Sequence, residues 1–360
     1  MIHAVKLGEK EITEELLKAG ANVNGKDKNN RTALYSAIEK GNYNLVKLLI
    51  DHGIKITYFD KKKTPLVHAA SLGLEKITKL LIDNGVRLNE VDINNRTALH
   101  AAISSNNINI VDLLIQKGIN INLYDGETTT LLEAVKINNE KIVQLIVDAN
   151  PILDDHDKKQ ILENQVNDTV YSKNNTNILN ILYRSSIPFE VNLLLGKISS
   201  DICYSAGDRT CLIGYMESPI HTAVKANDIE LAKILLHKGA NINTQAIEVE
   251  IDRWDICNIL TPMIIACQQG NIVMIKFLLE NGANVNIKKK HSHCKDIAQS
   301  SALHIATRNN NKEAVKLLLE HGADVDHEDY HGDTALQIAE QLKYIEIANI
   351  IKKYSLFDNK

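Results

Sequence analysis

The sequence contains few aromatic residues, few prolines and no long apolar run. Aromatic side chains make up 4% of the 360 residues, and there are 5 prolines and 1 tryptophan. No stretch approaches the ~20 consecutive apolar residues that a helix needs to cross a bilayer. Residues 1–10 also lack the uncharged apolar stretch behind a basic head that a secretory signal would show. We therefore expect a soluble protein that is neither secreted nor inserted in a membrane.

The sequence also lacks a large excess of charge and a cysteine framework. The formal net charge is −4, which gives no overall attraction for nucleic acid or an anionic membrane. The 5 cysteines are odd in number and lack framework-like spacing, which fits a reducing compartment. A hydrophobic fraction of 44% and a charged fraction of 24% are ordinary for a folded protein. These features favour another protein as the binding partner.

The sequence does contain an internal repeat of about 33 residues. A small residue, usually in the context T-x-L-x-x-A, recurs along the chain and serves here as the anchor of each repeat. The spacing widens only between Ala134 and Ala306, which indicates inserted residues in that region. The anchors are Ala4, Ala37, Ala69, Ala102, Ala134, Ala223, Ala266, Ala306 and Ala339.

Glycine or asparagine stands at two fixed positions beyond each of the first eight anchors. Both residue types tolerate the positive φ that ends a helix, so each repeat is expected to contain two helices. Four residues beyond the anchors are Gly8, Gly41, Gly73, Asn106, Asn138, Asn227, Gly270 and Asn310. Sixteen residues beyond them are Gly20, Gly53, Gly85, Gly118, Asn150, Gly239, Gly282 and Gly322.

The starts of the helices and their buried face are marked as well. Thr64, Ser218 and Thr261 each place a capping hydroxyl before a proline, which the first turn of a helix tolerates. Positions eight and twelve after every anchor are apolar and define one face of the second helix. A lone helix pair cannot bury that face, so stability must come from neighbouring repeats.

Four short segments resemble the ankyrin repeat: residues 97–100 (TALH), 239–243 (GANIN), 282–286 (GANVN) and 322–326 (GADVD). The resemblance implies an all-α ankyrin-repeat solenoid of about ten helix-turn-helix units with β-hairpin-like finger loops. It also implies that three histidines form structural hydrogen bonds between units. These residues occupy the family's T-P-L-H position and are His100, His221 and His304.

The resemblance predicts two stacks separated by a degenerate repeat, followed by a short tail. The first stack has about five repeats, the first one partial, and the second has about four. Long loops at 244–260 and 287–300, and the insertion after the degenerate repeat, are expected to be enlarged fingers or loops. The predicted parts are 1–154, 155–217, 218–354 and 355–360.

Ankyrin proteins usually bind partners with the fingers and the exposed side of the first helices, as the resemblance implies. Leu72 and Ile137 stand out, because an apolar side chain at a normally exposed position indicates a contact patch. Trp254, in the 244–260 insertion, is either a presented binding residue or folds back over the stack. Simple solvation is the alternative for each candidate. The candidates are Lys28, Arg31, Glu39, Lys40, Lys62, Lys63, Ser71, Leu72, Arg96, Ser104, Ser105, Lys136, Ile137 and Trp254.

Few motifs indicate chemistry beyond binding. Basic runs at 61–63 and 288–290 fit solvated turns better than a nucleic-acid site, because no stacking aromatics accompany them. His291, His293 and Cys294 are zinc donors without the spacing of a zinc site. Phosphate loops, nucleophile elbows and zinc-protease motifs are not found in the sequence. We therefore predict no enzyme activity, no cofactor and no metal.

The leading hypothesis is a monomeric module that binds and sequesters host proteins. This chain, an ankyrin array rich in Asn, Ile and Lys, resembles poxvirus ankyrin-repeat proteins, especially the avian ones. Many of those end in an F-box-like segment, which is not expected here because only residues 355–360 follow the last repeat. The resemblance implies a host-range or immune-modulating role in the host cytoplasm or nucleus. The alternatives are an effector of an intracellular bacterium, self-assembly through the array's ends, and an enzyme with a site in the inserted loops.

Overall fold

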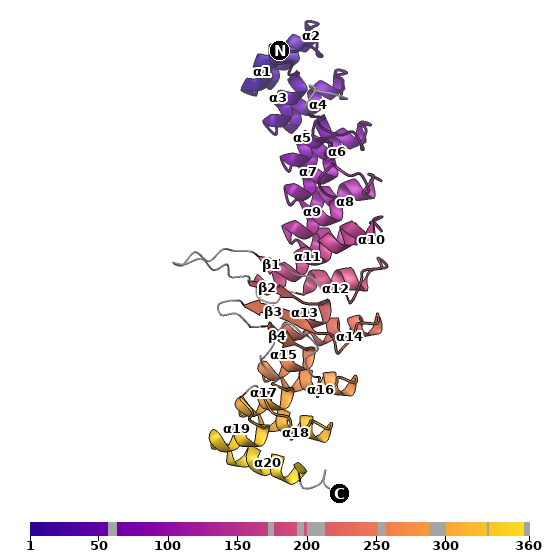
Figure 1. The fold of residues 1–360 in the computed structure, drawn as a ribbon. Coiled ribbons are helices and arrows are strands. Elements are labelled where there is room, and N and C mark those ends of the chain that lie inside the picture. The colour runs from indigo at the N-terminus through magenta and orange to yellow at the C-terminus, as the bar shows by residue number, and fades with distance from the viewer. Residues whose placement is uncertain are drawn as a thin grey trace, which may run out of the picture. The chain divides into compact units, whose positions relative to one another are not determined.

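The computed structural model describes residues 1–56, 63–171, 176–192, 198–199, 213–250, 257–287, 300–329 and 331–355. In these residues the chain forms helices α1 to α20 and four short strands, β1 to β4 (Figure 1). The elements group into two compact units. Unit 1 consists of Met1–Ile161 with Ser185–Ile187, and unit 2 consists of Leu162–Arg184 with Pro188–Lys360.

Unit 1 contains five helix pairs stacked in two layers. The first helix of each pair packs against the first helices of the neighbouring pairs, and the second helices pack in the same way. Figure 1 shows the two layers on opposite sides of this stack. The first helices are α1 (Ile2–Leu7), α3 (Ala33–Glu39), α5 (Pro65–Ser71), α7 (Ala98–Ser104) and α9 (Thr130–Ile137). The second helices are α2 (Lys10–Lys18), α4 (Tyr43–Asp51), α6 (Glu75–Asp83), α8 (Ile108–Gln116) and α10 (Glu140–Asp148).

Unit 2 repeats this arrangement with four helix pairs preceded by α12 (Asn177–Arg184). Helix α12 packs on α14 as a second helix would, and it buries Ile178 and Leu182. The division between the units falls inside α11 (Asp155–Tyr171). The first helices are α13 (Pro219–Lys225), α15 (Pro262–Gln268), α17 (Ala302–Arg308) and α19 (Ala335–Gln341). The second helices are α14 (Ile229–His237), α16 (Ile272–Glu280), α18 (Lys312–Glu320) and α20 (Ile345–Ser355).

Backbone geometry at the helix ends follows the glycine and asparagine pattern. Asn106 follows α7 with φ 54°, and Gly118 follows α8 with φ 81°. Positive φ values recur at both marked positions of the first eight repeats, so the prediction that these residues end two helices per repeat is confirmed. The last repeat differs, because Lys343 adopts φ 59° where the earlier repeats have Gly or Asn.

The predicted helix starts are also confirmed, and so are the buried faces of every repeat except the first. In the first repeat Ile12 is 52% exposed, and α2 instead buries Thr13 and Leu17 because α2 has a neighbouring second helix on one side only. Thr64 Oγ1 accepts a hydrogen bond from the Val67 backbone N–H at 3.2 Å and so satisfies one of the free N–H groups of the first turn. Leu45 and Leu49, eight and twelve residues after their anchor, are 0% exposed. Burying a leucine stabilises the folded state by ~2 kcal/mol, so the seam between repeats is the main source of stability.

The insertions before α13 and before α15 form one four-stranded antiparallel sheet. Met216 lies opposite Ile247, and Ile247 lies opposite Ile259, so the register connects the two fingers directly. Enlarged fingers are expected from the sequence at both places, and the structure adds that they pair with each other. Most of the third insertion, 287–300, lies outside the described residues. In sheet order the strands are β1 (Ile198–Ser199), β2 (Ile213–Met216), β3 (Ala246–Glu250) and β4 (Cys257–Leu260).

Asparagine side chains connect the loops that follow the second helices. The Asn89 side-chain oxygen accepts a hydrogen bond from the Asn120 backbone N–H at 2.8 Å. In unit 2, Asn286 accepts from the Asp324 N–H at 2.9 Å and donates to the Gly322 carbonyl at 2.6 Å. Each bond joins two consecutive repeats through backbone groups, so it sets the spacing of their loops. We call this series the asparagine ladder: Asn24, Asn89 and Asn122 in unit 1, and Asn192, Asn243 and Asn286 in unit 2.

Candidate protein-binding surface

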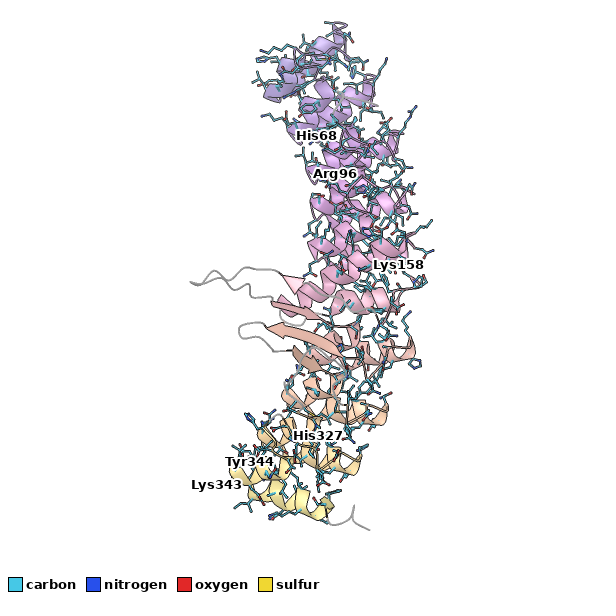
Figure 2. The ribbon with its side chains drawn as sticks, viewed as in Figure 1. His68, Arg96, Lys158, His327, Lys343 and Tyr344 are labelled. Atoms are coloured by element: carbon cyan, nitrogen blue, oxygen red, sulfur yellow. The ribbon has the colours of Figure 1, made fainter. Side chains whose placement is uncertain are left out.

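The ends of the first helices form a line of side chains along unit 1. Each residue of this line stands three positions after an anchor, and the line is continuous because the first helices pack side by side. Figure 2 labels His68 and Arg96 on this side of the unit. We call the line the helix-end column, and its residues are Leu7, Lys40, Leu72, Ser105 and Ile137.

Two leucines of the column are exposed. Leu72 keeps 46% of its surface exposed, whereas other leucines of unit 1, such as Leu66 and Leu99, are buried. Leu7 is 65% exposed at the same position of the first repeat. Leu7 is not among the predicted site residues, although its distance from Ala4 is the same as that of Leu72 from Ala69. The other helix-end candidates are exposed (Glu39, Lys40, Ser104, Ser105, Lys136) or half-buried (Ser71, Ile137).

In three repeats the residue at this position is polar and bonds to the preceding repeat: Ser105, Gln269 and Asn309. Ser105 Oγ lies 3.1 Å from the Ala70 carbonyl of the preceding repeat and 3.1 Å from the Ala102 carbonyl of its own helix, so its one proton has both acceptors within reach. In unit 2, Gln269 Nε2 donates to the Lys225 carbonyl at 2.8 Å. The Ala70 and Lys225 carbonyls lie in the last turn of a first helix, where they have no i+4 N–H partner within the helix. Ser105 therefore has a structural role inside the stack, and its role in partner binding stays a prediction.

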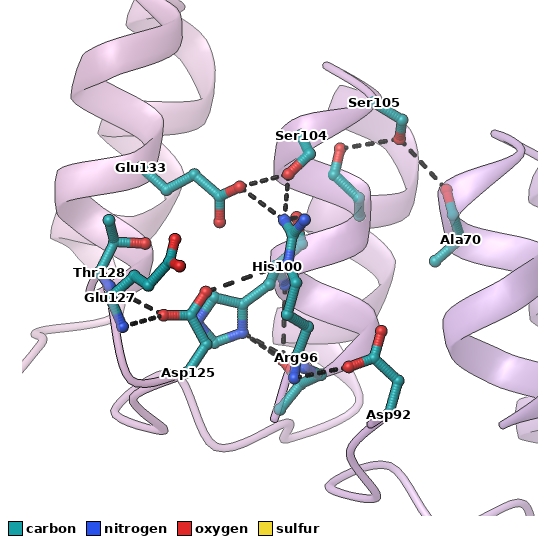
Figure 3. Close-up of polar contacts among 12 residues, drawn as sticks. Ala70, Asp92, Arg96, His100, Ser104, Ser105, Asp125, Glu127, Thr128 and Glu133 are labelled. Carbon is teal, nitrogen blue, oxygen red and sulfur yellow. Dashed lines mark hydrogen bonds and ion pairs between the residues drawn. The ribbon is translucent and has the colours of Figure 1, made fainter. Parts of the chain in front are cut away.

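Arg96 lies at the centre of a polar cluster between the repeat of α7 and the repeat of α9 (Figure 3). Its guanidinium donates to Glu133 Oε1 at 2.7 Å and to the His100 carbonyl at 3.2 Å. Ser104 Oγ also donates to Glu133 Oε1 and accepts from Arg96. The structure thus brings two predicted site residues, Arg96 and Ser104, onto one carboxylate, which leaves less of both for a partner.

Burial and charge act in opposite directions on Glu133. Burial raises the pKa of this carboxyl group, while the Ser104 hydroxyl and the Arg96 guanidinium lower it. The net shift is upward, which means that desolvation outweighs the two favourable contacts. Removal of Arg96 would therefore leave a poorly compensated carboxylate between two repeats.

Four short fingers are each organised by one aspartate: Asp27, Asp92, Asp125 and Asp329. Asp92 Oδ1 accepts from the Asn94 N–H at 2.8 Å and from the Arg96 N–H at 3.0 Å, which closes a turn around the side chain. Asp27 accepts in the same way and pairs with Lys6 Nζ at 2.9 Å. The Lys6 hydrogen bond is the main reason that the pKa of Asp27 falls to about 2. These aspartates are not among the predicted site residues, although each stands at nearly the same distance before a T-x-L turn.

Two more candidates, Arg31 and Glu39, meet at the ring of Tyr35. The Arg31 guanidinium carbon lies 5.1 Å from the ring centroid, and Tyr35 Oη donates to Glu39 Oε1 at 3.5 Å. The ring of His68, from the next repeat, stacks on Tyr35 with centroids 4.9 Å apart and an interplanar angle of 11°. The stack links two repeats, and the Tyr35 side chain contacts a cation at its ring and a carboxylate at its hydroxyl.

The remaining candidates are placed separately. Lys28 is exposed in the finger that precedes α3, and Lys63 is half-buried just before α5. Lys62 and Trp254 lie outside the described residues. Their roles, and those of the other candidates, stay predictions.

Histidines of the first helices join consecutive repeats in unit 2. His221 Nδ1 accepts from the Ser218 N–H at 3.1 Å, and its Nε2–H donates to the Leu260 carbonyl at 3.1 Å. His304 makes the same pair of contacts with the Ser301 N–H and the Asp333 carbonyl, each at 3.2 Å. The predicted structural hydrogen bonding between units is confirmed at these two positions. Both rings must be neutral, because one nitrogen accepts a hydrogen bond.

Two features of the described residues bear on chemistry. They contain no group of three or more His, Cys, Asp or Glu residues placed to hold a metal ion. His291, His293 and Cys294 lie outside the described ranges. Burial raises the pKa of the Cys267 thiol to about 12, so this cysteine stays protonated and is a poor nucleophile. No helix in the described part is both long and apolar enough for a membrane span.

Comparison with known proteins agrees with this geometry. A family model of ankyrin repeats (3 copies) matches residues 1–60, 58–125, 131–289, 221–324 and 287–359, which is most of the chain. The chain belongs to the ankyrin-repeat family. It is a helical ankyrin solenoid, and ankyrin repeats of this kind make it a protein–protein interaction scaffold.

One curated protein is similar over a short segment. Inversin of Gallus gallus is 46% identical over 50 residues, which is 14% of this chain and 4% of the chicken protein. The match thus spans a small fraction of that protein's length, about one and a half repeats of this fold. It supports the repeat assignment and carries no argument about a shared partner.

Proposed function

We propose that this ankyrin-repeat protein binds other proteins through the first-helix ends and fingers of unit 1 and acts by sequestering them. The observation that carries the proposal is Leu72, an apolar side chain that is 46% exposed at a first-helix end, where the next repeat has the polar Ser105. Exposed Lys28, Lys40 and Lys136 lie in a finger and in the first-helix ends of other repeats of unit 1. An exposed apolar residue on a surface that also carries charged residues is typical of a protein contact.

The partner class in this proposal is a host protein, and the source is a virus. The support is the resemblance of this Asn-, Ile- and Lys-rich array to poxvirus ankyrin-repeat proteins. On this proposal the protein acts as a monomer in the host cytoplasm or nucleus, and its effect is host-range or immune modulation by occupation of a partner's surface. No chemical step is required of it.

The test compares two matched triple variants of the full chain. The site variant Lys28→Glu, Lys40→Glu, Leu72→Asp changes exposed residues of fingers and first-helix ends. The control variant Lys47→Glu, Lys79→Glu, Ile12→Asp makes the same chemical changes at exposed positions of second helices. Both variants should keep the wild-type circular dichroism spectrum and melting temperature.

Quantitative affinity capture from host cell extract, followed by mass spectrometry, then measures binding. We expect the site variant to lose its specific partners by about tenfold or more, because a charge is placed at the apolar contact. The control variant should capture the same proteins as wild type. Equal capture by all three proteins would place the binding surface elsewhere.

A further inference from the structure

The N-terminal half of the helix-end column presents an apolar, a cationic and an apolar side chain in succession. These are Leu7, Lys40 and Leu72, from the ends of α1, α3 and α5. Leu7 is 65% exposed, Leu72 is 46% exposed, and Lys40 is exposed as well. The next member, Ser105, is bonded to the preceding repeat and ends this pattern.

The charge of Lys40 is not balanced within the stack. It forms no side-chain hydrogen bond or ion pair with any residue in the described ranges. The neighbouring carboxylate, Glu39, instead accepts a hydrogen bond from Tyr35, whose ring also lies next to the Arg31 guanidinium. An acidic group from a partner could therefore pair with Lys40 without displacing an existing contact. That contact would be strengthened by the apolar surface on both sides, which excludes water.

The spacing of the column restricts the shape of a ligand that touches all three residues. Helices α1 and α3 pack directly on one another, as do α3 and α5, and packed helix axes are ~8–10 Å apart. A polyproline II segment has three residues per turn and rises ~3.1 Å per residue, so one turn advances ~9 Å. Residues i, i+3 and i+6 of such a segment therefore meet three successive repeats. A β-strand returns to the same face every ~7 Å and falls out of step.

We propose that Leu7, Lys40 and Leu72 bind an extended, polyproline II segment of a partner protein with the pattern apolar, x, x, acidic, x, x, apolar. The acidic side chain pairs with Lys40, and the two apolar side chains pack on the leucines. The pattern reads the same in both directions, so either chain polarity satisfies it. This inference rests on the proposed function, and it adds the chemistry and the spacing of the recognised segment.

The experiment uses four fluorescent peptides and the full-length chain, with anisotropy as the readout. The matching peptide has the core Leu-Pro-Pro-Glu-Pro-Pro-Leu. Two control peptides place the same three side chains at a spacing of two residues and at a helical spacing of seven. The fourth peptide carries Lys in place of Glu. We expect saturable binding of the matching peptide only, and weakening by added salt because an ion pair is involved.

Protein variants then test the individual contacts. Leu72→Ala should weaken the affinity for the matching peptide about tenfold. Leu342→Ala is the matched control, because Leu342 occupies the same position of its repeat and is also 46% exposed. Lys40→Glu should abolish binding of the Glu peptide and restore binding of the Lys peptide. Melting curves identify any variant that fails to fold, and the peptide exchange keeps the Lys40 test interpretable because it looks for a gain.

The inference is overturned if the peptide with the two-residue or the seven-residue spacing binds as tightly as the peptide with the three-residue spacing. It is also overturned if the Lys40→Glu variant does not bind the Lys peptide. The proposed function fails separately. If the site variant loses protein partners while no peptide binds, the scaffold function stands and the polyproline II inference is wrong. If peptides bind but partner capture does not depend on this surface, the proposed site of sequestration is wrong instead.

Discussion

Two buried histidines make the stability of unit 2 sensitive to acid. Burial lowers the pKa of His221 to about 4, and burial also lowers the pKa of His304. In the unfolded chain both rings titrate near 6.5, so the unfolded state binds more protons than the folded state below that pH. Stability is therefore complete above about pH 6.5 and is lost as the pH falls toward about 4.

We predict that the lowered pKa of His221 alone reduces the free energy of unfolding by about 2 kcal/mol when the pH falls from 7 to 5. Urea unfolding at a series of pH values measures this slope. His221→Gln should flatten it, because glutamine keeps a donor and an acceptor but does not titrate in this range. His52→Gln, at an exposed position of unit 1, should leave it unchanged. An unaltered slope in His221→Gln would contradict the assignment.

Arg96 and Glu133 give a second prediction at the residue scale. Arg96→Ala should destabilise unit 1 by about 2 kcal/mol, because the partly buried Glu133 loses its counter-charge. The double variant Arg96→Ala, Glu133→Ala should recover much of that loss in urea unfolding. Arg87→Ala is the control. The Arg87 side chain is 78% exposed, and an ion pair such as the one it forms with Glu90 adds little to the free energy of unfolding. Additive effects of the two substitutions would show that the pair is not coupled.

The positions of Arg96 and Ser104 in the repeat are predictable from the sequence, whereas their contacts are not. Periodicity places Arg96 in a finger and Ser104 at the end of a first helix, but it cannot show that both contact Glu133. The contact between Arg96 and Glu133 joins residues 37 apart and depends on side-chain reach across two repeats. Repeat spacing aligns backbone positions, whereas the choice between an internal ion pair and a free surface charge depends on rotamers and burial.

At the scale of elements, the helices were predictable and the sheet was not. Helix ends follow from Gly and Asn at fixed distances, as Asn106 and Gly118 illustrate. The pairing of β2 with β3 joins two insertions of different length, for which the repeat period gives no register. Their alternating residues indicate strands, but only the spatial arrangement shows that the strands share one sheet.

The asparagine ladder also belongs to the scale of elements. Its asparagines are visible in the sequence, but the hydrogen bonds that they form between repeats are not predictable from it. Asn89→Ala removes the acceptor for the Asn120 N–H, so we predict a loss of about 1 kcal/mol in urea unfolding. Asn94→Ala is the matched control, because Asn94 lies in the exposed part of the same connection and contributes only its backbone N–H to Asp92. A loss of equal size in both variants would mean that the ladder bond adds nothing.

At the scale of the whole molecule, the division into two units predicts how the chain unfolds. Repeat arrays are stabilised by contacts between neighbours, so each unit should unfold as its own cooperative block. Leu45→Ala in unit 1 and Leu278→Ala in unit 2 each empty a fully buried position and should cost ~3 kcal/mol.

Hydrogen exchange with mass spectrometry distinguishes the two blocks in urea. Leu45→Ala should lower the midpoint for peptides of Met1–Ile161 and leave the rest near wild type, and Leu278→Ala should do the reverse. A single transition in which both variants shift every peptide together would show that the two units unfold as one.

The asparagine ladder also bears on how such a protein acquires new recognition elements. The same bond joins residues 31 apart between Asn89 and Asn120 and 49 apart between Asn192 and Asn241. A lineage can therefore lengthen the finger between two consecutive repeats while the asparagine hydrogen bond between those repeats is kept. Insertion, rather than gradual substitution, becomes an accessible evolutionary route to a new binding partner, and the four-stranded sheet is the product expected where two neighbouring fingers have both been extended.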